Sequence, residues 1–566
     1  MNIHQKILTV VNKAMTKIFP VILLFLWSVS DLSMAENVTV NIPYGPIIGS
    51  LRQTSSGSTP YFSFQGIPYA APPVESLRLL PTQPPKPWTM PLDLTSDSDI
   101  MCPQLSETVS GDLLGQEDCL YMNIYTPATM DGKIQTDASL PVMVWIYGGG
   151  FVTGSARKAD YGPDLWLDQG IVVVAMNYRL YSLGFLSLGI PEAPGNQGLL
   201  DQLEALKLVQ SSIALFGGDP NQVTLAGQSA GSGSALYHFM SPRSEGLFQR
   251  IIAQSGSNFS PSLYSISPSD AVRFGVEAGI AMGCIIGGDS PHARLDCLQG
   301  LSLERFVRLS SVIGINLKPN EDYEYAAEPF MPMSPMEALR SGNYLKDVTV
   351  MVGTNEDDGL ILTTPLVTDP SFYTLYRYLW SVIAPGILFH IPVTSSSFEA
   401  SRKASELADF YIGGSSNIVP ENFDIITDMF TDAFVTYPVE CFARYVHQTQ
   451  NVYQYRYAHQ GQYGLNPDAD IPKLGVNHAD ELYLQWDPIY NNHHELNEDD
   501  RTMSKILINV WSSFIKTGIP QGPENVLWTP ISDEKSEYLV LNLTSRMERS
   551  SDYQTKMEFW NELFPC

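Results

Sequence analysis

The residues whose types and spacing most clearly indicate catalytic chemistry form the stretch "GQSAG", in which Ser229 lies between Gly227 and Gly231. The run before it, "QVTLA", is apolar and β-branched and predicts a short buried strand, whereas "SALYHFM" after it predicts a helix. A strand, a glycine-flanked turn and a helix form a nucleophile elbow, which lifts a serine side chain to the carboxyl edge of a sheet. We therefore expect Ser229 to act as a nucleophile, beside the unpaired N–H groups of a helix N-terminus.

A serine nucleophile also needs hydrogen-bond donors for the oxyanion that forms when it attacks a carbonyl group. The stretch "YGGGF" follows the apolar run "PVMVWI", and its glycines leave backbone N–H groups unobstructed. Gly149 and Gly150, together with Ala230 after the nucleophile, are the predicted donors. Losing one such donor typically costs about 3 kcal/mol in the transition state.

The base and the acid that orients it must come from elsewhere in the chain. His478, one of nine histidines, lies in "GVNHADELY", a predicted loop before an apolar helix. The stretch "GTNEDDG" follows the strand-like run "VTVMV" and offers three carboxylates, between which the residue types do not decide: Glu356, Asp357 and Asp358. The chain order of serine, acid and histidine is the order of hydrolases with this elbow, which favours His478 as the base.

The elements that would position these residues alternate along the chain. Apolar runs predict strands at 140–147, 170–179, 222–226, 348–355 and 451–459. Several are continuously apolar, as strands covered on both faces must be. Leucines recur on one face of a predicted helix at 196–216. We therefore expect an α/β fold with a mostly parallel sheet and helices on both faces, in one domain over 36–566.

Composition narrows the class of protein. Of 566 residues, 44% are hydrophobic and 16% are charged, so a large core can form, and a disordered chain or coiled coil is excluded. The formal net charge of −27 argues against nucleic-acid binding and against binding to anionic membranes.

The N-terminus resembles an export signal. Three lysines precede the apolar run "IFPVILLFLWSV": Lys6, Lys13 and Lys17. The small-residue stretch "SMA" then ends just before Glu36, which predicts a signal peptide over 1–35 and a secreted protein. The apolar run is shorter than the about 20 residues that span a bilayer, and no later segment predicts a transmembrane anchor. Met15 is an alternative start, because it would give a more compact signal.

Cysteines and sequons fit a secretory route. Two pairs of cysteines bracket short loops, namely Cys102 with Cys119 and Cys284 with Cys297. The remaining two, Cys441 and Cys566, are candidates to pair with each other, or Cys566 could reach another subunit. Candidate glycosylation sites of the N-x-S/T type are Asn37, Asn258 and Asn542.

Taken together, these motifs resemble the type-B carboxylesterase and cholinesterase family over nearly the whole chain after residue 36. The stretches that carry the resemblance include "FQGIPYAAPP", "EDCLYMNIYTP", "VWIYGGGF", "FGGDPNQVTLAGQSAG", "SEGLFQRIIAQSGS" and "GVNHADELY". The resemblance implies an α/β-hydrolase fold and cleavage of small-molecule carboxylic esters, with no metal and no organic cofactor.

The family pattern also assigns individual residues. It places the acid at Asp358, directly before the closing glycine of "GTNEDDG", the base at His478, and the oxyanion donors at the three positions named above. It implies disulfides Cys102–Cys119 and Cys284–Cys297. It makes Arg78 and Glu117 a structural salt bridge.

Departures from the family pattern bear on the substrate. Most relatives have glutamate where this chain has Gln228, so a negative charge beside the base is lost. Many relatives have glutamate in place of Asp358. The loop from Cys102 to Cys119 lacks the tryptophan on which cholinesterases stack choline, which speaks against acetylcholine.

Two alternatives to a general esterase remain. The first is an adhesion or binding protein of the neuroligin type, which keeps the fold without turnover, although such proteins typically have a broken nucleophile and a transmembrane anchor. The second is narrower, because "GQSAG" also resembles juvenile hormone esterases. That match is partial, since "LRLL" stands where those enzymes have Arg-Phe.

Overall fold

The structure of the chain is a computed structural model. It describes residues 37–106, 111–284, 290–312, 318–389, 398–465, 473–486, 495–532 and 537–566. The predicted signal peptide, residues 1–35, lies outside the described residues. Within the described ranges, no helix combines the length and the apolar character needed to cross a bilayer.

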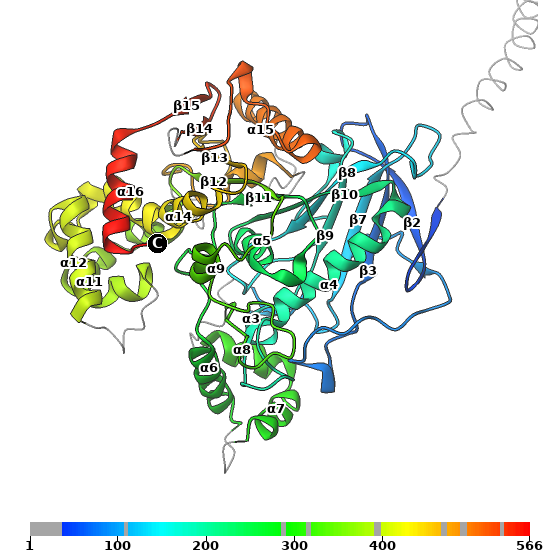
Figure 1. Ribbon diagram of the computed structural model, residues 1–566, viewed down its shortest axis with the longest axis horizontal. Helices are drawn as coiled ribbons and strands as arrows, with labels where there is room; N and C mark the ends of the chain where they lie inside the picture. The colour runs from blue at the N-terminus through cyan, green and yellow to red at the C-terminus, as the bar shows by residue number, and fades with distance from the viewer. Residues whose placement is uncertain are drawn as a thin grey trace, which may run out of the picture.

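A central sheet organises the fold, and the strands in its middle run parallel to one another (Figure 1). In spatial order these are β9 (Val172–Met176), β8 (Leu140–Ile146), β10 (Gly218–Gln228), β11 (Arg250–Gln254), β12 (Thr349–Asn355), β13 (Val452–Tyr457) and β14 (Tyr538–Leu541). The apolar runs that predicted strands correspond to β8, β9, β10, β12 and β13. Their residues are almost all buried, because helices cover both faces of the sheet.

Antiparallel strands extend this sheet at both ends. On one side lie β1 (Val38–Ile42), β2 (Gly45–Gln53), β3 (Pro60–Pro68) and β7 (Tyr121–Pro127), with the short β4 (Leu92–Asp93) beside β2. On the other side β15 (Arg546–Glu548) pairs with β14. A separate two-stranded ribbon, β5 (Gln104–Leu105) with β6 (Leu113–Leu114), lies within the loop from Cys102 to Cys119. The result is the predicted α/β architecture.

Helices cover the two faces of the sheet. The predicted helix at 196–216 is α4 (Gln197–Ser212), continued by a 3₁₀ turn over Ile213–Phe216. It packs with α5 (Ala230–Met240) on one face, and α15 (Glu498–Thr517) packs against β8 and β10 from the opposite face (Figure 1). α15 also contacts α2 (Asp164–Leu167). α14 (Tyr437–Val446) packs against β12 and β13. Further helices are α3 (Tyr181–Phe185), α6 (Pro268–Ala281), α7 (Pro291–Gln299), α8 (Leu303–Val312) and α9 (Pro335–Ser341).

A second apolar cluster lies beside the main core, at the left of Figure 1. It is built by α10 (Leu360–Thr368), α11 (Ser371–Leu388), α12 (Phe398–Ile412), α13 (Phe423–Thr431) and α16 (Ser551–Leu563). Because α10 begins two residues after Asp358, this helical cluster adjoins the carboxyl end of β12.

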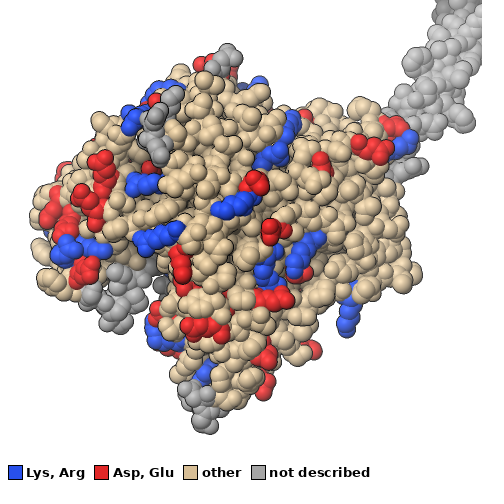
Figure 2. All heavy atoms as spheres, viewed as in Figure 1, with Lys and Arg blue, Asp and Glu red and all other residues tan. Residues whose placement is uncertain are grey.

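Charged side chains on the face shown in Figure 2 are interspersed, with basic residues beside acidic ones and wide uncharged areas between them. This face has no continuous basic stripe of the kind that binds nucleic acid.

Candidate active site

Ser229 lies at the sharp turn between β10 and α5, at the carboxyl end of the strand. Its backbone has φ 56° and ψ −122°, a conformation that residues other than glycine rarely adopt. The N–H group of Ser229 donates a hydrogen bond of 2.8 Å to the carbonyl oxygen of Gln254, which fixes the turn against the neighbouring strand. The sequence thus predicted the strand, turn and helix around this serine correctly.

The two glycines of "GQSAG" are required by close packing. A Cβ atom on Gly227 would lie 2.4 Å from the carbonyl carbon of Gly231. A Cβ atom on Gly231 would lie 2.0 Å from the carbonyl oxygen of Ile146 at the end of β8. Only glycine therefore lets the turn approach β8 this closely.

His478 and Asp358 form a buried pair at the same edge of the sheet. The Nδ1 atom of His478 lies 2.7 Å from Oδ1 of Asp358, and both side chains are buried. The second carboxylate oxygen, Oδ2 of Asp358, accepts a hydrogen bond of 2.7 Å from the backbone N–H of Asn355. Because Nδ1 faces a carboxylate, it carries the ring proton, and Nε2 of the neutral ring is left with a lone pair.

The structure separates the three acidic residues that sequence chemistry could not rank. Glu356 is exposed. The Asp357 carboxylate accepts a hydrogen bond of 2.9 Å from the N–H of Val476. Burial raises the pKa of Asp357 to about 6. Only Asp358 of the three is hydrogen-bonded to His478.

The second ring nitrogen of His478 contacts Gln228. The Nε2 atom of His478 lies 3.1 Å from the side-chain Nε2 of Gln228, so the amide N–H donates to the lone pair of the ring. Among the described residues, no hydrogen bond joins the hydroxyl group of Ser229 to His478. Phe434 packs edge-on against the imidazole with ring centroids 5.5 Å apart, and it comes from a π-helical turn over Asp432–Thr436.

The glycine loop after β8 lies beside the serine. Gly149 and Gly150 have φ values of 103° and 62°, which a side chain would disfavour. The N–H groups of Gly149, Gly150 and Ala230 have no hydrogen-bond partner within the described part of the chain, and Ala230 is the first residue of α5. Backbone N–H groups without a partner, next to a nucleophile in the chain or in the glycine loop beside it, are what an oxyanion hole requires.

A cluster of amides and one carboxyl group, which sequence reasoning missed, lies behind the His478–Asp358 pair. Glu481 is fully buried and accepts hydrogen bonds of 2.6 Å from Asn355 and 3.2 Å from Gln254. Burial, and next the charge of Asp358, raise the pKa of Glu481 to about 7. Its position three residues after His478, in the first turn of a 3₁₀ helix, is the signal that could have indicated it.

Four cysteines form two disulfides, Cys102–Cys119 and Cys284–Cys297. The candidate bond between Cys441 and Cys566 is not formed in the structure, where both cysteines are free. Cys441 lies in α14 and Cys566 follows α16, and these two helices contact each other. The Cys566 thiol donates a hydrogen bond of 3.8 Å to Oδ1 of Asn561. The expected pair of Arg78 and Glu117 is present, with Nε 2.6 Å from Oε1.

The sequons differ in accessibility. Asn37 is exposed and Asn542 is partly exposed. Asn258 is fully buried, and its amide nitrogen contacts the Sδ atom of Met240 at 2.9 Å. Burial argues against the glycan predicted at Asn258, because a sugar could not be attached there without displacing the core around α5.

A mostly parallel sheet with a serine elbow and a buried His–Asp pair at one edge is the arrangement of an α/β-hydrolase. Comparison with known proteins agrees, because the Carboxylesterase family matches residues 36–560. The chain therefore belongs to the carboxylesterase family, and it is a carboxylic-ester hydrolase.

Individual relatives cover most of the chain. It is 33% identical over 543 residues to juvenile hormone esterase from Tribolium castaneum, a match that covers 90% of this chain and 89% of the relative. It is 31% identical to esterase FE4 from Myzus persicae, with 95% of each chain covered. A crystal structure of juvenile hormone esterase from Manduca sexta, with OTFP covalently attached, superposes with a TM-score of 0.81 at 24% identity. That match covers 94% of this chain and 100% of the other, and it supports the fold.

Proposed function

We propose that this protein is a secreted serine esterase whose nucleophile is Ser229, whose base is His478 and whose orienting acid is Asp358. The observation that carries the proposal is the 2.7 Å hydrogen bond between His478 and Asp358 at the sheet edge where the strained Ser229 turn also lies. A buried carboxylate on Nδ1 fixes the tautomer in which Nε2 can accept a proton.

The first half-reaction forms an acyl-enzyme. The Ser229 oxygen attacks the ester carbonyl carbon while Nε2 of His478 takes the hydroxyl proton, which requires the imidazole to exchange its contact with Gln228 for one with the serine. The negative charge on the former carbonyl oxygen is stabilised by the N–H groups of Gly149, Gly150 and Ala230. The C–O bond to the alcohol then breaks, and the alcohol leaves with the proton from His478.

The second half-reaction releases the acid. A water molecule attacks the acyl carbon while Nε2 of His478 takes one of its protons, and the same three donors stabilise the second oxyanion. The bond to Ser229 breaks, and the serine oxygen recovers the proton from His478. Asp358 stabilises the imidazolium that forms in each half-reaction.

The test is hydrolysis of short- and medium-chain p-nitrophenyl esters by the secreted protein, beside Ser229→Ala. We expect turnover by the wild type and a loss of at least about 1,000-fold in the variant. An organophosphate probe should phosphonylate Ser229 of the wild type only. Well-folded wild type that neither turns over esters nor reacts with the probe would refute the serine mechanism, and it would favour the adhesion-type alternative.

A narrower candidate substrate is an insect juvenile hormone, which is suggested by the similarity to juvenile hormone esterase from Tribolium castaneum together with the "GQSAG" stretch. A panel of natural esters that includes a juvenile hormone tests this candidate. A kcat/KM for the hormone well above the values for simple alkyl esters would support it, and equal or lower values would exclude it.

Export is proposed from the N-terminal pattern alone. Expression in a secretory host should give protein in the medium whose N-terminal sequence begins at Glu36. Retention of the unprocessed chain in the cell would contradict export.

A further inference from the structure

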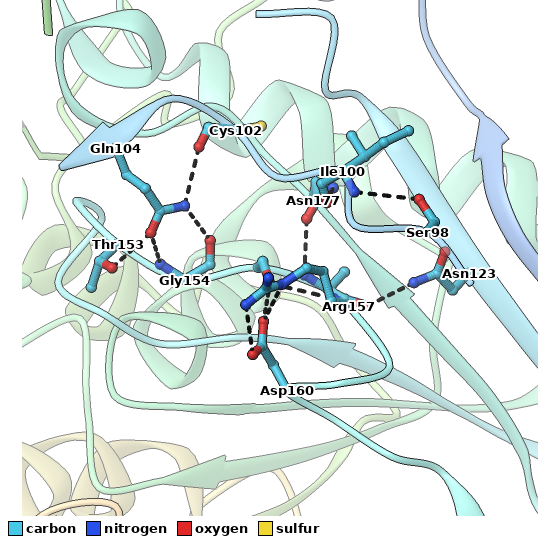
Figure 3. A network of polar contacts seen from close by, with 12 residues as sticks. Ser98, Ile100, Cys102, Gln104, Asn123, Thr153, Gly154, Arg157, Asp160 and Asn177 are labelled. Atoms are coloured by element: carbon cyan, nitrogen blue, oxygen red, sulfur yellow. Dashed lines mark hydrogen bonds and ion pairs between the residues drawn. The ribbon is translucent and has the colours of Figure 1, made fainter. Parts of the chain in front are cut away.

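The side chain of Gln104, in the loop closed by the Cys102–Cys119 disulfide, is bonded to the glycine loop that follows β8. Gln104 is 4% exposed. Its Nε2 donates to the carbonyl oxygens of Gly154 at 2.8 Å and Cys102 at 3.1 Å. Its Oε1 accepts from the Thr153 hydroxyl group at 2.7 Å and from the Gly154 N–H at 2.9 Å (Figure 3). One buried amide thus makes three hydrogen bonds to two consecutive residues of the loop.

The residues that Gln104 contacts are connected to a predicted oxyanion donor through the peptide unit between Gly149 and Gly150. The N–H groups of Val152 and Thr153 donate to the carbonyl oxygen of Gly149 at 2.9 and 3.0 Å. The carbonyl group of Gly149 and the N–H group of Gly150 belong to the same planar, trans peptide, so they point in opposite directions. Fixing the Gly149 carbonyl toward Thr153 therefore fixes the direction in which the Gly150 N–H points.

The packing leaves this turn little freedom. A Cβ atom on Gly149 would lie 2.3 Å from the carbonyl oxygen of Thr153, so the two ends of the turn are in close contact. A displacement of Thr153 is therefore transmitted to Gly149. No other side chain among the described residues makes a hydrogen bond to Thr153 or Gly154.

Two more buried amides hold a later part of the same loop. Asn177 accepts a hydrogen bond of 2.8 Å from the N–H of Ala156, and Asn123 donates one of 2.6 Å to the carbonyl oxygen of Ala156. Both amides are labelled in Figure 3. Ala156 is six residues beyond Gly150, so these two amides anchor the loop without contacting the turn that carries the donors. They provide an internal comparison for Gln104.

We propose that Gln104 is a positioning residue for the oxyanion hole, which orients the Gly150 N–H through Thr153 and thereby links the disulfide loop to catalysis. This inference rests on the proposed function, in which that N–H stabilises the oxyanion. Gln104 acts on the transition state, because the donors bind the developing charge more strongly than they bind the neutral ester.

The experiment compares Gln104→Met with the wild type in kcat, KM and affinity for an alkyl trifluoromethyl ketone, which forms a tetrahedral oxyanion adduct with a serine. We expect kcat to fall about 10- to 100-fold with KM changed less than about threefold. Affinity for the ketone should fall by the same factor as kcat/KM. A milder variant, Thr153→Val, removes one hydroxyl group at nearly constant volume, and it should shift the same quantities by a smaller factor.

Two controls separate positioning from general stability. Gln116→Met alters an exposed amide in the same disulfide loop, and it should leave all three quantities unchanged. Within the described part of the chain, the Gln116 side chain bonds only to the Asp118 carbonyl oxygen. Asn123→Ala removes a buried amide from the far part of the glycine loop. It should lower the melting temperature, but the ratio of ketone affinity to KM should stay near the wild-type value.

The outcomes distinguish this inference from the proposed function. Wild type without esterase activity would refute the proposed function. An active wild type, with Gln104→Met and Thr153→Val both matching Gln116→Met in kcat and ketone affinity, would overturn the role of Gln104 alone. If ketone affinity fell in Gln104→Met by the same factor as KM rose, the role of Gln104 would equally be overturned. That pattern indicates general damage to the binding site.

Discussion

The Nε2 atom of His478 is hydrogen-bonded to the side-chain amide of Gln228, 3.1 Å away, and Gln228 directly precedes Ser229 in the chain. An amide can donate to the neutral imidazole, as here, and after rotation it can accept from the imidazolium. A glutamate at this position could only accept. The contact therefore supports the neutral base that the first proton transfer needs.

Replacing Gln228 by glutamate should change the pH dependence of hydrolysis. A carboxylate beside Nε2 favours the protonated ring, so the acidic limb of the kcat/KM profile should move to higher pH by roughly one unit. Gln228→Met removes the amide without adding charge, and it should give a smaller shift in the same direction. An acidic limb that stays in place, or moves to lower pH, in Gln228→Glu would contradict the contact described here.

Glu481 should make stability depend on pH. Burial raises the pKa of Glu481 from 4.5 to about 7 in the folded protein. Between these values the unfolded chain releases a proton that the folded chain keeps, so the folded state loses stability as pH rises from about 4.5 to about 7. In Glu481→Gln this pH-dependent decrease in the free energy of unfolding, of the order of 3 kcal/mol, should be absent.

The measurement is urea unfolding of Glu481→Gln and wild type between pH 5 and pH 8. The free energies of unfolding should be similar at the acidic end, and the variant should become the more stable protein as pH rises. A constant difference across this range would show that Glu481 does not titrate there.

At position 229, glycine should give a more stable protein than a residue with a side chain. Its φ of 56° and ψ of −122° strain any residue that has a side chain, and such strain costs of the order of 1–3 kcal/mol. Both Ser229→Gly and Ser229→Ala should be inactive. The free energy of unfolding of the glycine variant should be about 1 kcal/mol higher than that of the alanine variant. This difference is the strain relieved, less the stability lost because glycine raises the conformational entropy of the unfolded chain. Equal stabilities would show that the turn stores no strain.

Cys441 and Cys566 should form a disulfide under oxidising conditions. The neighbouring Cys441 thiol lowers the pKa of the Cys566 thiol. The Cys566 thiolate can therefore attack the disulfide of oxidised glutathione and release one glutathione thiolate, after which Cys441 displaces the second. Peptide mapping without reduction should find the two residues joined, and Cys441→Ser should leave Cys566 open to alkylation. Full alkylation of both thiols in the oxidised wild type would disprove the pairing.

Glycopeptide mapping of the secreted protein should find Asn258 unmodified, because its side chain is fully buried. Asn37 and Asn542 are accessible and should carry any glycan that is present. A glycan on Asn258 in active protein would require a different conformation of the segment after β11.

The sequence by itself determined the α/β class, the parallel strands, the serine elbow, the glycine donors and the candidate base. These features depend on local pattern, since the apolar runs, the glycines and the strand-to-helix turn are fixed by neighbouring residues. The acid was different. Glu356, Asp357 and Asp358 share the same local environment, so residue chemistry could not separate them, and only the family pattern indicated Asp358.

The tertiary structure decided contacts between residues far apart in the chain. Asp358 and His478 are separated by 120 positions and Gln228 and His478 by 250, so their pairing depends on how the loops at the sheet edge pack. The same holds for the bonds from Gln104 to the glycine loop, the burial of Asn258 and the contact of Cys441 with Cys566. Sequence patterns specify which residues can do chemistry, whereas packing of distant segments fixes the distance and direction on which that chemistry depends.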